Sequence, residues 1–254
     1  MTPDALTTLI NATWPAQTMR DVSGWTLRST KDAGSRANAA TATKAAKPEE
    51  HPLAAGAQRA IGQTPLFMVR QGEEALDAHL AQAGYTLKDP TVCYTAPITA
   101  IATQRAPPVT CFEVWPPLAT QLNIWEAGGV NAARAAIMDR AAGPRTTILG
   151  RVHNTPAATA FGAVHGRTAM VHAIETLPAF RRQGLARLMI RALAFWAQSH
   201  GARTLALLVT QANAPANALY TSLGMTVAAR YHYRIHPVPV TTHTAASACC
   251  EQTR

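Results

Sequence analysis

The chain has 254 residues, 48% of them hydrophobic and 15% charged, which is an ordinary globular composition with enough material for one large domain or two small ones. Lys and Arg outnumber Asp and Glu by 23 to 14, but no run of five like charges occurs, so we expect a basic surface rather than a nucleic-acid-binding protein. The absence of a leader-like N-terminus, of an 18-residue apolar run and of metal-ligand cysteine spacing predicts a cytoplasmic protein without a membrane segment or a metal site.

The first part of the chain predicts a smaller α/β domain. Residues 35–51 indicate a strand that runs into a surface loop, and an alternating stretch at 91–103 precedes a Pro pair. We interpret residues 104–110 as a linker. The predicted units are therefore an N-terminal domain at 1–106, a second domain at 109–236 and a flexible tail at 237–254, which has no periodic apolar face.

The second part predicts the order strand, two helices, three strands, helix, strand, helix, strand. The firmest helix begins at Leu185, because apolar residues recur at helical spacing until Gly201. The predicted segments are 109–115, 118–129, 130–143, 146–152, 157–166, 168–177, 185–200, 204–210, 213–223 and 225–235. This order predicts an α/β fold with a mixed, mostly antiparallel sheet and helices on both faces.

A faint internal similarity relates the two parts. Shifting the sequence by 140 residues places 65–87 on 205–227 without a gap, and five positions are then identical, among them Gly84 with Gly224. Both segments predict a strand, a turn, a helix, a glycine cap and a strand. Duplication and chance are both compatible with five identities, because any α/β chain can produce this plan.

The stretch LPAFRRQGLARLM, residues 177–189, concentrates hydrogen-bond donors at the start of the predicted helix. The first amides of a helix have no partner within it, and the helix dipole adds positive charge there. Gly184 and Ala186 remove bulk, so a phosphate or diphosphate could approach the main chain while the arginines add contacts. The alternative is a plain strand-to-helix turn with surface arginines.

Two motifs in this order resemble those of the GNAT superfamily of N-acetyltransferases. The stretch RRQGLA resembles motif A at Arg181, Gly184 and Ala186. Downstream, NAPANALYTSLGM resembles a second family segment, with Met225 in place of the usual Phe; the matching residues are Asn213, Ala216, Leu219, Tyr220 and Gly224. The resemblance covers about residues 109–236 and implies a GNAT-like acyl-CoA N-acyltransferase fold that moves an acetyl group from acetyl-CoA, as co-substrate, to a primary amine by direct attack.

The resemblance also assigns cofactor-binding roles. It implies that motif A holds the diphosphate and that the preceding strand pairs with the pantetheine arm; the residues concerned are Leu177, Arg181, Arg182, Gln183, Gly184, Leu185, Ala186, Arg187, Asn213 and Tyr220. Tyr220 would protonate the CoA sulfur, or would only pack in the core. Asn213 would bond to the cofactor arm, cap the helix before Pro215, or do both.

The general base is assigned by elimination. Glu175 lies two residues before Leu177, so strand alternation places it on the same face as Leu177 and His172 on the other. Glu175 could therefore reach an amine through water, or it could be an ordinary strand carboxylate paired with an arginine. For the wall around the acetyl acceptor, the family's usual layout points to Trp115, Trp125, Glu126 and Tyr231.

The first part has no counterpart of RRQGLA. In the 140-residue shift, Glu73 stands where Asn213 does and Leu80 where Tyr220 does, so this half is not expected to bind acetyl-CoA. The segment from Ser23 to Ala39 loosely resembles the opening of tandem GNAT-like proteins with a degenerate first unit. A non-catalytic acyl-CoA sensor and, because of the charge of +9, a nucleic-acid-binding protein are the competing functions. A homodimer and the identity of the amine stay open.

Overall fold

The computed structural model describes residues 1–237, so the predicted tail lies almost wholly outside the described residues. One mixed sheet runs through the molecule in the order β1-β2-β3-β4-β11-β5-β10-β9-β8-β7-β6. Its strands are β1 Thr18–Val22, β2 Trp25–Ser29, β3 Ala40–Ala42, β4 Leu66–Arg70, β5 Thr86–Pro97, β6 Cys111–Val114, β7 Arg145–Val152, β8 Thr155–His165, β9 Thr168–Thr176, β10 Thr204–Thr210 and β11 Thr226–Ile235. Among the strand pairs of residues 1–237, the β3–β4 and β9–β10 pairs are parallel and the others are antiparallel, which confirms the predicted mostly antiparallel sheet.

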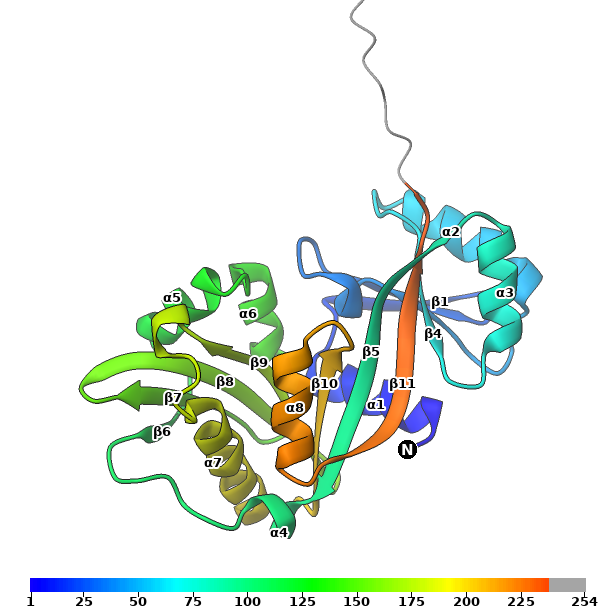
Figure 1. Ribbon diagram of the computed structural model, residues 1–254. Coiled ribbons are helices and arrows are strands. Elements are labelled where there is room, and N and C mark those ends of the chain that lie inside the picture. Colours follow the sequence, from blue (N-terminus) through cyan, green and yellow to red (C-terminus); the bar gives the residue numbers. More distant parts are fainter. Residues whose placement is uncertain (238–254) are drawn as a thin grey trace, which may run out of the picture.

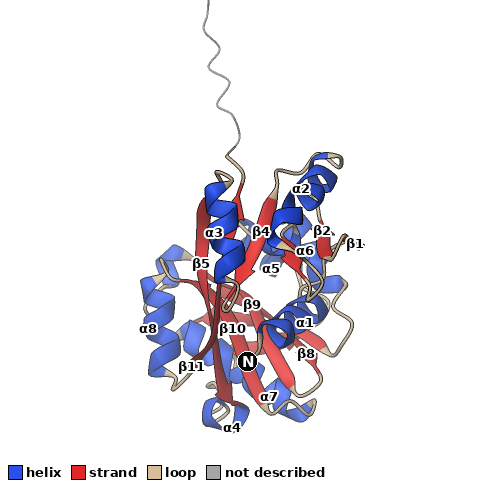
Figure 2. Ribbon diagram, turned by 90° about the vertical axis from the view of Figure 1, so that its right-hand side faces the viewer, coloured by secondary structure: helices blue, strands red, loops and turns tan. Residues whose placement is uncertain are grey.

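Helices cover both faces of this sheet (Figures 1 and 2). They are α1 Pro3–Thr13, α2 His51–Arg59, α3 Glu74–Gln82, α4 Ile98–Ile101, α5 Ala119–Ala127, α6 Ala132–Asp139, α7 Leu185–Ser199 and α8 Ala214–Ser222, with short 3-10 turns at Ser35–Ala37, Pro48–Glu50 and Pro178–Phe180. One face packs against α4, α7 and α8, and in the N-terminal half against α2 and α3. The other face packs against α1, α5 and α6. No helix of the described residues combines the length and apolar character needed to cross a bilayer.

Apolar periodicity explains why these elements pack where they do. Alternate residues of β4 separate to the two faces: Leu66 and Met68 pack with α1, whereas Phe67 and Val69 pack with α2 and α3. The first helix, α1, had no counterpart among the predicted elements. It begins at a Thr2 cap, whose hydroxyl accepts a hydrogen bond from the Ala5 amide.

The two halves of the chain exchange their last strands. β5 of the N-terminal half lies between β10 and β11 of the C-terminal half, and β11 lies between β4 and β5. Figure 1 shows these two long strands crossing between the two groups of elements. The register is the same on both sides, because subtracting 140 from Thr210 and adding 140 to Thr91 converts the Thr210↔Thr91 pair into the Arg70↔Tyr231 pair. The segments that share a predicted plan thus also share their pairing.

Side chains repeat this reciprocal arrangement. Tyr94 of β5 donates its hydroxyl proton to Asn217 of α8 at 3.1 Å. At the positions related by the 140-residue shift, Arg234 of β11 donates from Nε to Asp77 of α3 at 2.7 Å. Each half therefore fixes the helix that precedes its own exchanged strand to the exchanged strand of the other half. The boundary between residues 106 and 109 stays a prediction about sequence units, which share one sheet.

In the N-terminal half, side chains occupy the space where the parallel strands β3 and β4 end. Beyond the Thr41↔Met68 pair, Arg70 donates from Nη2 to the Ala42 carbonyl at 2.7 Å, which ties the ends of β3 and β4 together. The carboxylate of Glu73 accepts from the Arg70 amide at 2.7 Å and also pairs with its guanidinium. A buried arginine and its carboxylate thus occupy the space where β3 and β4 end, and the expectation that this half does not bind acetyl-CoA stays a prediction.

Candidate functional site

The mouth of α7 presents unpaired backbone donors. Gly184 precedes the helix in the left-handed region at φ 80°, and no side chain caps it. The first hydrogen bond of the helix runs from the Leu188 amide to the Gly184 carbonyl. Among the described residues, the six amides from 182 to 187 have no hydrogen-bond acceptor. Amides without acceptors at the start of a helix are donors of the kind that bind phosphate groups.

The arginines of this segment do three different things. Arg181 turns back to β9, donating from Nε to the Thr176 carbonyl at 3.0 Å and pairing with Glu175 at 3.2 Å. Arg187 donates to the Ser222 hydroxyl of α8 at 2.7 Å, which links the two helices. Arg182 is exposed, and its side chain makes no hydrogen bond within residues 1–237. Arg182 is thus the cation at this mouth that is available to a ligand.

The strands that lead to this mouth diverge. β9 and β10 pair in parallel only from Thr168↔Thr204 to Val171↔Leu207. Beyond these pairs, β10 continues beside β5 and β9 beside β8. A wedge therefore opens between the free ends of β9 and β10, on the C-terminal side of both strands, which is where ligands bind in open α/β sheets.

A bulge in β9 changes which side chains face which way. Between the His172↔Phe161 and Glu175↔Thr159 pairs, two residues of β9 oppose Ala160 alone, and Ala173 adopts φ 49°. Ile174 packs on the α7 face. His172 packs against Trp14 and Phe161 on the opposite face, and Glu175 also lies there, beneath α5. The expectation that His172 and Glu175 face opposite ways was wrong, because the bulge resets the alternation.

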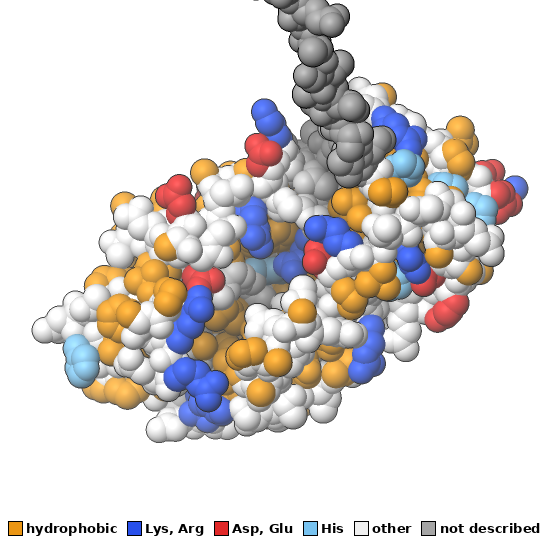
Figure 3. Space-filling model, turned by 45° about the horizontal axis from the view of Figure 1, so that its top comes forward, with side chains coloured by type: hydrophobic (Ala, Val, Ile, Leu, Met, Phe, Trp, Pro, Cys, Tyr) orange, Lys and Arg blue, Asp and Glu red, His pale blue; other side chains and the backbone are white. Residues whose placement is uncertain are grey.

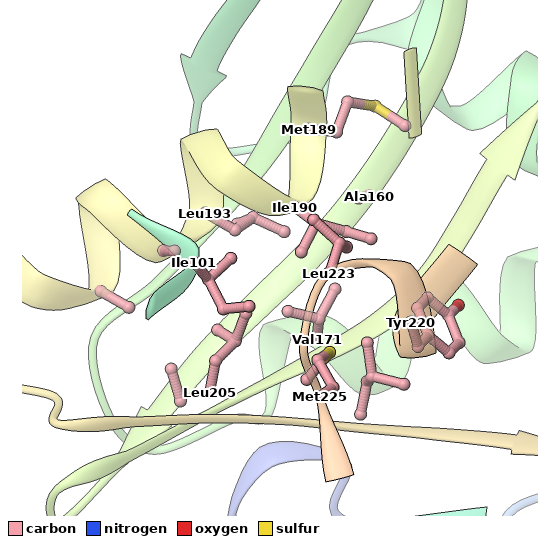
Figure 4. Close-up of a cluster of buried hydrophobic side chains, with 14 of the residues drawn as sticks. Ile101, Ala160, Val171, Met189, Ile190, Leu193, Leu205, Tyr220, Leu223 and Met225 are labelled. Atoms are coloured by element: carbon pink, nitrogen blue, oxygen red, sulfur yellow. The ribbon is translucent and has the colours of Figure 1, made fainter. Parts of the chain in front are cut away.

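Tyr220 lies at the edge of the core beside the diverging strands. Its ring is 6% exposed and makes an edge contact with Tyr94, with centroids 5.8 Å apart. Figure 4 shows its hydroxyl on the side away from Leu193 and Leu205. Burial raises the pKa of Tyr220 to about 12, so the hydroxyl is protonated at neutral pH. Tyr220 is thus part of the core, as its structural alternative anticipated, and its role as a proton donor stays a prediction.

Asn213 caps α8, since its side chain accepts from the Ala216 amide at 3.2 Å. The helix cap expected as the alternative role of Asn213 is therefore present, and a contact between Asn213 and the cofactor stays a prediction.

Glu175 is held by its neighbours. It pairs with Arg181, accepts from the Thr176 amide at 3.2 Å, and lies beneath Gly128 at the end of α5. A Cβ on Gly128 would come within 2.3 Å of the Glu175 side chain, so only glycine leaves room for it there. The carboxylate is 18% exposed. The strand ion pair anticipated as the alternative is present, and a proton-accepting role stays a prediction.

The residues expected in the acceptor wall are mostly structural. Trp125 is fully buried and donates from Nε1 to the Ala173 carbonyl at 2.7 Å, which holds the bulge. Trp115 lies half-buried beneath the Arg145 guanidinium. Tyr231 is 3% exposed on the α1 face, with its ring against Tyr233. Glu126 is exposed on α5.

Sequence reasoning missed a cationic cluster on the face opposite α7 and α8. Arg36 donates from Nη1 to His172 Nδ1 at 3.2 Å, and Tyr231 and Tyr233 lie beside its guanidinium. Arg134 of α6 is close enough for the charge of Arg36 to lower its pKa, after the larger effect of burial. These residues come from four distant segments, so no local pattern could have joined them.

The C-terminal half of the chain is similar to a known protein family. The family model described as acetyltransferase (GNAT) family matches residues 109–225. A search of the curated proteins found no match.

Several solved structures share the fold over most of the chain. A GCN5-related N-acetyltransferase from Kribbella flavida is 18% identical, with a TM-score of 0.72 over 92% of this chain and 95% of that one. A conserved protein of unknown function from Staphylococcus epidermidis is 12% identical, with a TM-score of 0.66 over 89% and 96%. A tandem GNAT protein from the clavulanic acid biosynthesis pathway is 15% identical, with a TM-score of 0.59 over 78% and 74%. The chain therefore has the GNAT acyl-CoA N-acyltransferase fold.

Proposed function

We propose that the protein, whose residues 109–225 match the model of the acetyltransferase (GNAT) family, transfers the acetyl group of acetyl-CoA to a primary amine at the wedge between β9 and β10. The observation that carries the proposal is the row of six amides without acceptors at the mouth of α7, next to that wedge. These amides, with Arg182, would bind the diphosphate. Leu177 directly follows β9, but its amide donates to the Ala157 carbonyl and its carbonyl accepts from the Phe180 amide. The pantetheine arm would therefore pack against Leu177 rather than pair with its amide, and the Asn213 amide group would contact the same arm.

The reaction requires an attack by a neutral amine and a proton for the leaving sulfur. The amine nitrogen attacks the thioester carbon, and the carbon–sulfur bond breaks as the Tyr220 hydroxyl gives its proton to the sulfur. The proton released by the amine passes through water to the Glu175 carboxylate.

Binding and turnover are measured separately. Calorimetry with acetyl-CoA tests the mouth of α7, and release of free CoA thiol with a panel of primary amines tests the transfer. We expect both to be positive. Binding without thiol release for any amine would instead indicate an acyl-CoA sensor, and no binding would overturn the proposal.

Gly184→Ala is expected to weaken acetyl-CoA binding about tenfold, which corresponds to about 1.4 kcal/mol. The added Cβ would meet no protein atom within 4 Å, so it would project into the space that the diphosphate needs. Gly201→Ala is the matched control, because Gly201 also has a positive φ and open space around it, at the far end of α7. Calorimetry and thermal unfolding of both variants check this. If Gly184→Ala and Gly201→Ala lose the same affinity for acetyl-CoA, the loss comes from backbone strain and not from the space occupied by the new Cβ.

Glu175→Gln is expected to lower kcat about 100-fold, the order expected when a general base is lost. The isosteric amide keeps the packing beneath Gly128 but cannot accept the proton. Glu113→Gln, at the exposed position of β6, removes the same charge elsewhere and serves as the control. Steady-state rates and melting temperatures of both variants check this. A lower melting temperature with unchanged kcat would show that Glu175 is only a structural ion pair.

A further inference from the structure

The cationic cluster around Arg36 has charge without compensation. No carboxylate of the described residues forms an ion pair with Arg36 or Arg134. Burial raises the pKa of Tyr233 well above its usual value, so this hydroxyl stays neutral and supplies no counter-charge. Arg36 and Arg134 therefore both carry positive charge in a partly buried setting, which is unfavourable unless hydrogen bonds or an anion compensate it. Arg134 donates from Nη1 to the Gly129 carbonyl at 3.2 Å.

Hydrogen bonding leaves part of the Arg36 fork unused. Its Nη1 donates to His172, whereas its Nε is buried and has no partner among the described residues. A guanidinium can only donate, so His172 Nδ1 accepts, and the proton of His172 lies on Nε2, facing the Thr13 hydroxyl at 3.0 Å. Burial and, after it, the charge of Arg36 lower the pKa of His172 well below its usual value. His172 is thus a neutral support that orients Arg36.

The cluster lies next to the proposed reaction centre but on the other side of the sheet from α7. His172 directly follows Val171, the last β9 residue paired with β10, and a strand advances about 3.3 Å per residue. The diphosphate site at α7 is on the opposite face, so the CoA phosphates do not account for the cluster. The face drawn in Figure 3 is hollowed near its centre, and basic and histidine side chains are visible within the hollow.

We infer that Arg36 and Arg134 bind the carboxylate of the acetyl acceptor, and that this acceptor is an α-amino acid. Arginine forks match carboxylates with paired hydrogen bonds. Arg36 donates to His172, which directly follows the last β9 residue paired with β10, so a carboxylate on Arg36 would lie near the wedge. An α-amino acid is the shortest acceptor that joins such a carboxylate to an amine. The inference rests on the proposed function, and it assigns the N-terminal half, through Arg36, a part in choosing the substrate.

The test compares matched substrates and matched variants of the full chain. The wild type is offered free α-amino acids, the corresponding amino-acid amides and the decarboxylated amines, and release of CoA thiol is followed. We expect turnover of one or more free amino acids, with kcat/KM at least about tenfold above that of the corresponding amide. Arg36→Gln should lower kcat/KM for the free acid about 10- to 100-fold and leave the rate with the amide unchanged. Arg134→Gln should act in the same direction, and Arg167→Gln, an exposed arginine elsewhere, should have no effect.

The outcomes separate the inference from the proposed function. If amides and decarboxylated amines react as well as the free acids, or if Arg36→Gln affects all three equally, the inference is wrong and the acetyltransferase function stands. If no amine reacts, the proposed acetyl transfer is wrong. Calorimetry of free amino acids with CoA-loaded protein then tests the carboxylate site independently of turnover. Binding that Arg36→Gln abolishes and Arg167→Gln preserves would support the anion site, and no binding to the wild type would overturn it. Melting temperatures identify any variant that does not fold, in which case Arg36→Lys, which keeps the charge but not the fork, replaces it.

Discussion

Tyr220→Phe is expected to lower kcat about 100- to 1,000-fold, the range associated with loss of a general acid, with little change in the affinity for acetyl-CoA. The ring would keep its contact with Tyr94 and its place at the edge of the core, and only the proton donor would be lost. Thiol release under saturating acetyl-CoA and amine measures this. Tyr85→Phe, in the core of the N-terminal half, is the matched control and should retain activity.

The pH profile gives an independent check on the same residue. Burial raises the pKa of Tyr220 to about 12, whereas an ordinary tyrosine titrates near about 10. The proton donor should therefore remain intact as the pH passes 10, and kcat should show no ionisation of Tyr220 there. A wild-type loss of kcat near pH 10 that Tyr220→Phe removes would contradict the buried setting, and an unchanged kcat in the variant would leave Tyr220 as core packing only.

The parts of the site that could be predicted are those that one short segment encodes. The α7 helix follows from apolar residues at helical spacing, and its open mouth follows from Gly184, which tolerates φ 80° where other residues are strained. The same holds for the Asn213 cap, because Asn and the following Pro215 specify a helix start within three residues. Such signals are local, so they can be recognised in the sequence without knowledge of the fold.

The parts that could not be predicted depend on partners distant in the chain. The β9 bulge places Ala173 at φ 49°, although no glycine in the sequence indicates a bulge there. The Trp125 indole of α5 donates a hydrogen bond to the Ala173 carbonyl, and this contact depends on the fold. Strand pairing is likewise invisible, because the alternation within β5 and β11 specifies which residues are buried but not which strands lie beside them. Arg36 lies 136 positions from His172, and only the folded sheet brings them together.

The strand exchange leads to the second large expected effect: residues 109–254 produced alone should not fold. Without β5, β10 loses its antiparallel neighbour from Thr204 to Thr210, and β11 loses both of its neighbours. Core residues such as Leu205 and Tyr220 would then be exposed, at about 1.5–3 kcal/mol for each large apolar side chain. Several such losses equal the whole stability of a typical domain, about 5–15 kcal/mol. We expect an aggregated fragment without a cooperative unfolding transition.

Co-expression of residues 1–106 with residues 109–254 is the control for this experiment, because the cut falls in the mostly exposed loop after α4 and leaves every strand pair intact. The two pieces should copurify as a folded complex that binds acetyl-CoA, as measured by calorimetry and circular dichroism. A soluble and active C-terminal fragment would instead mean that β11 can pair directly with β10. Residues 109–254 would then fold without the N-terminal half. In that event the N-terminal half would be dispensable for folding and for the transfer itself, and any contribution of Arg36 would be limited to the choice of substrate.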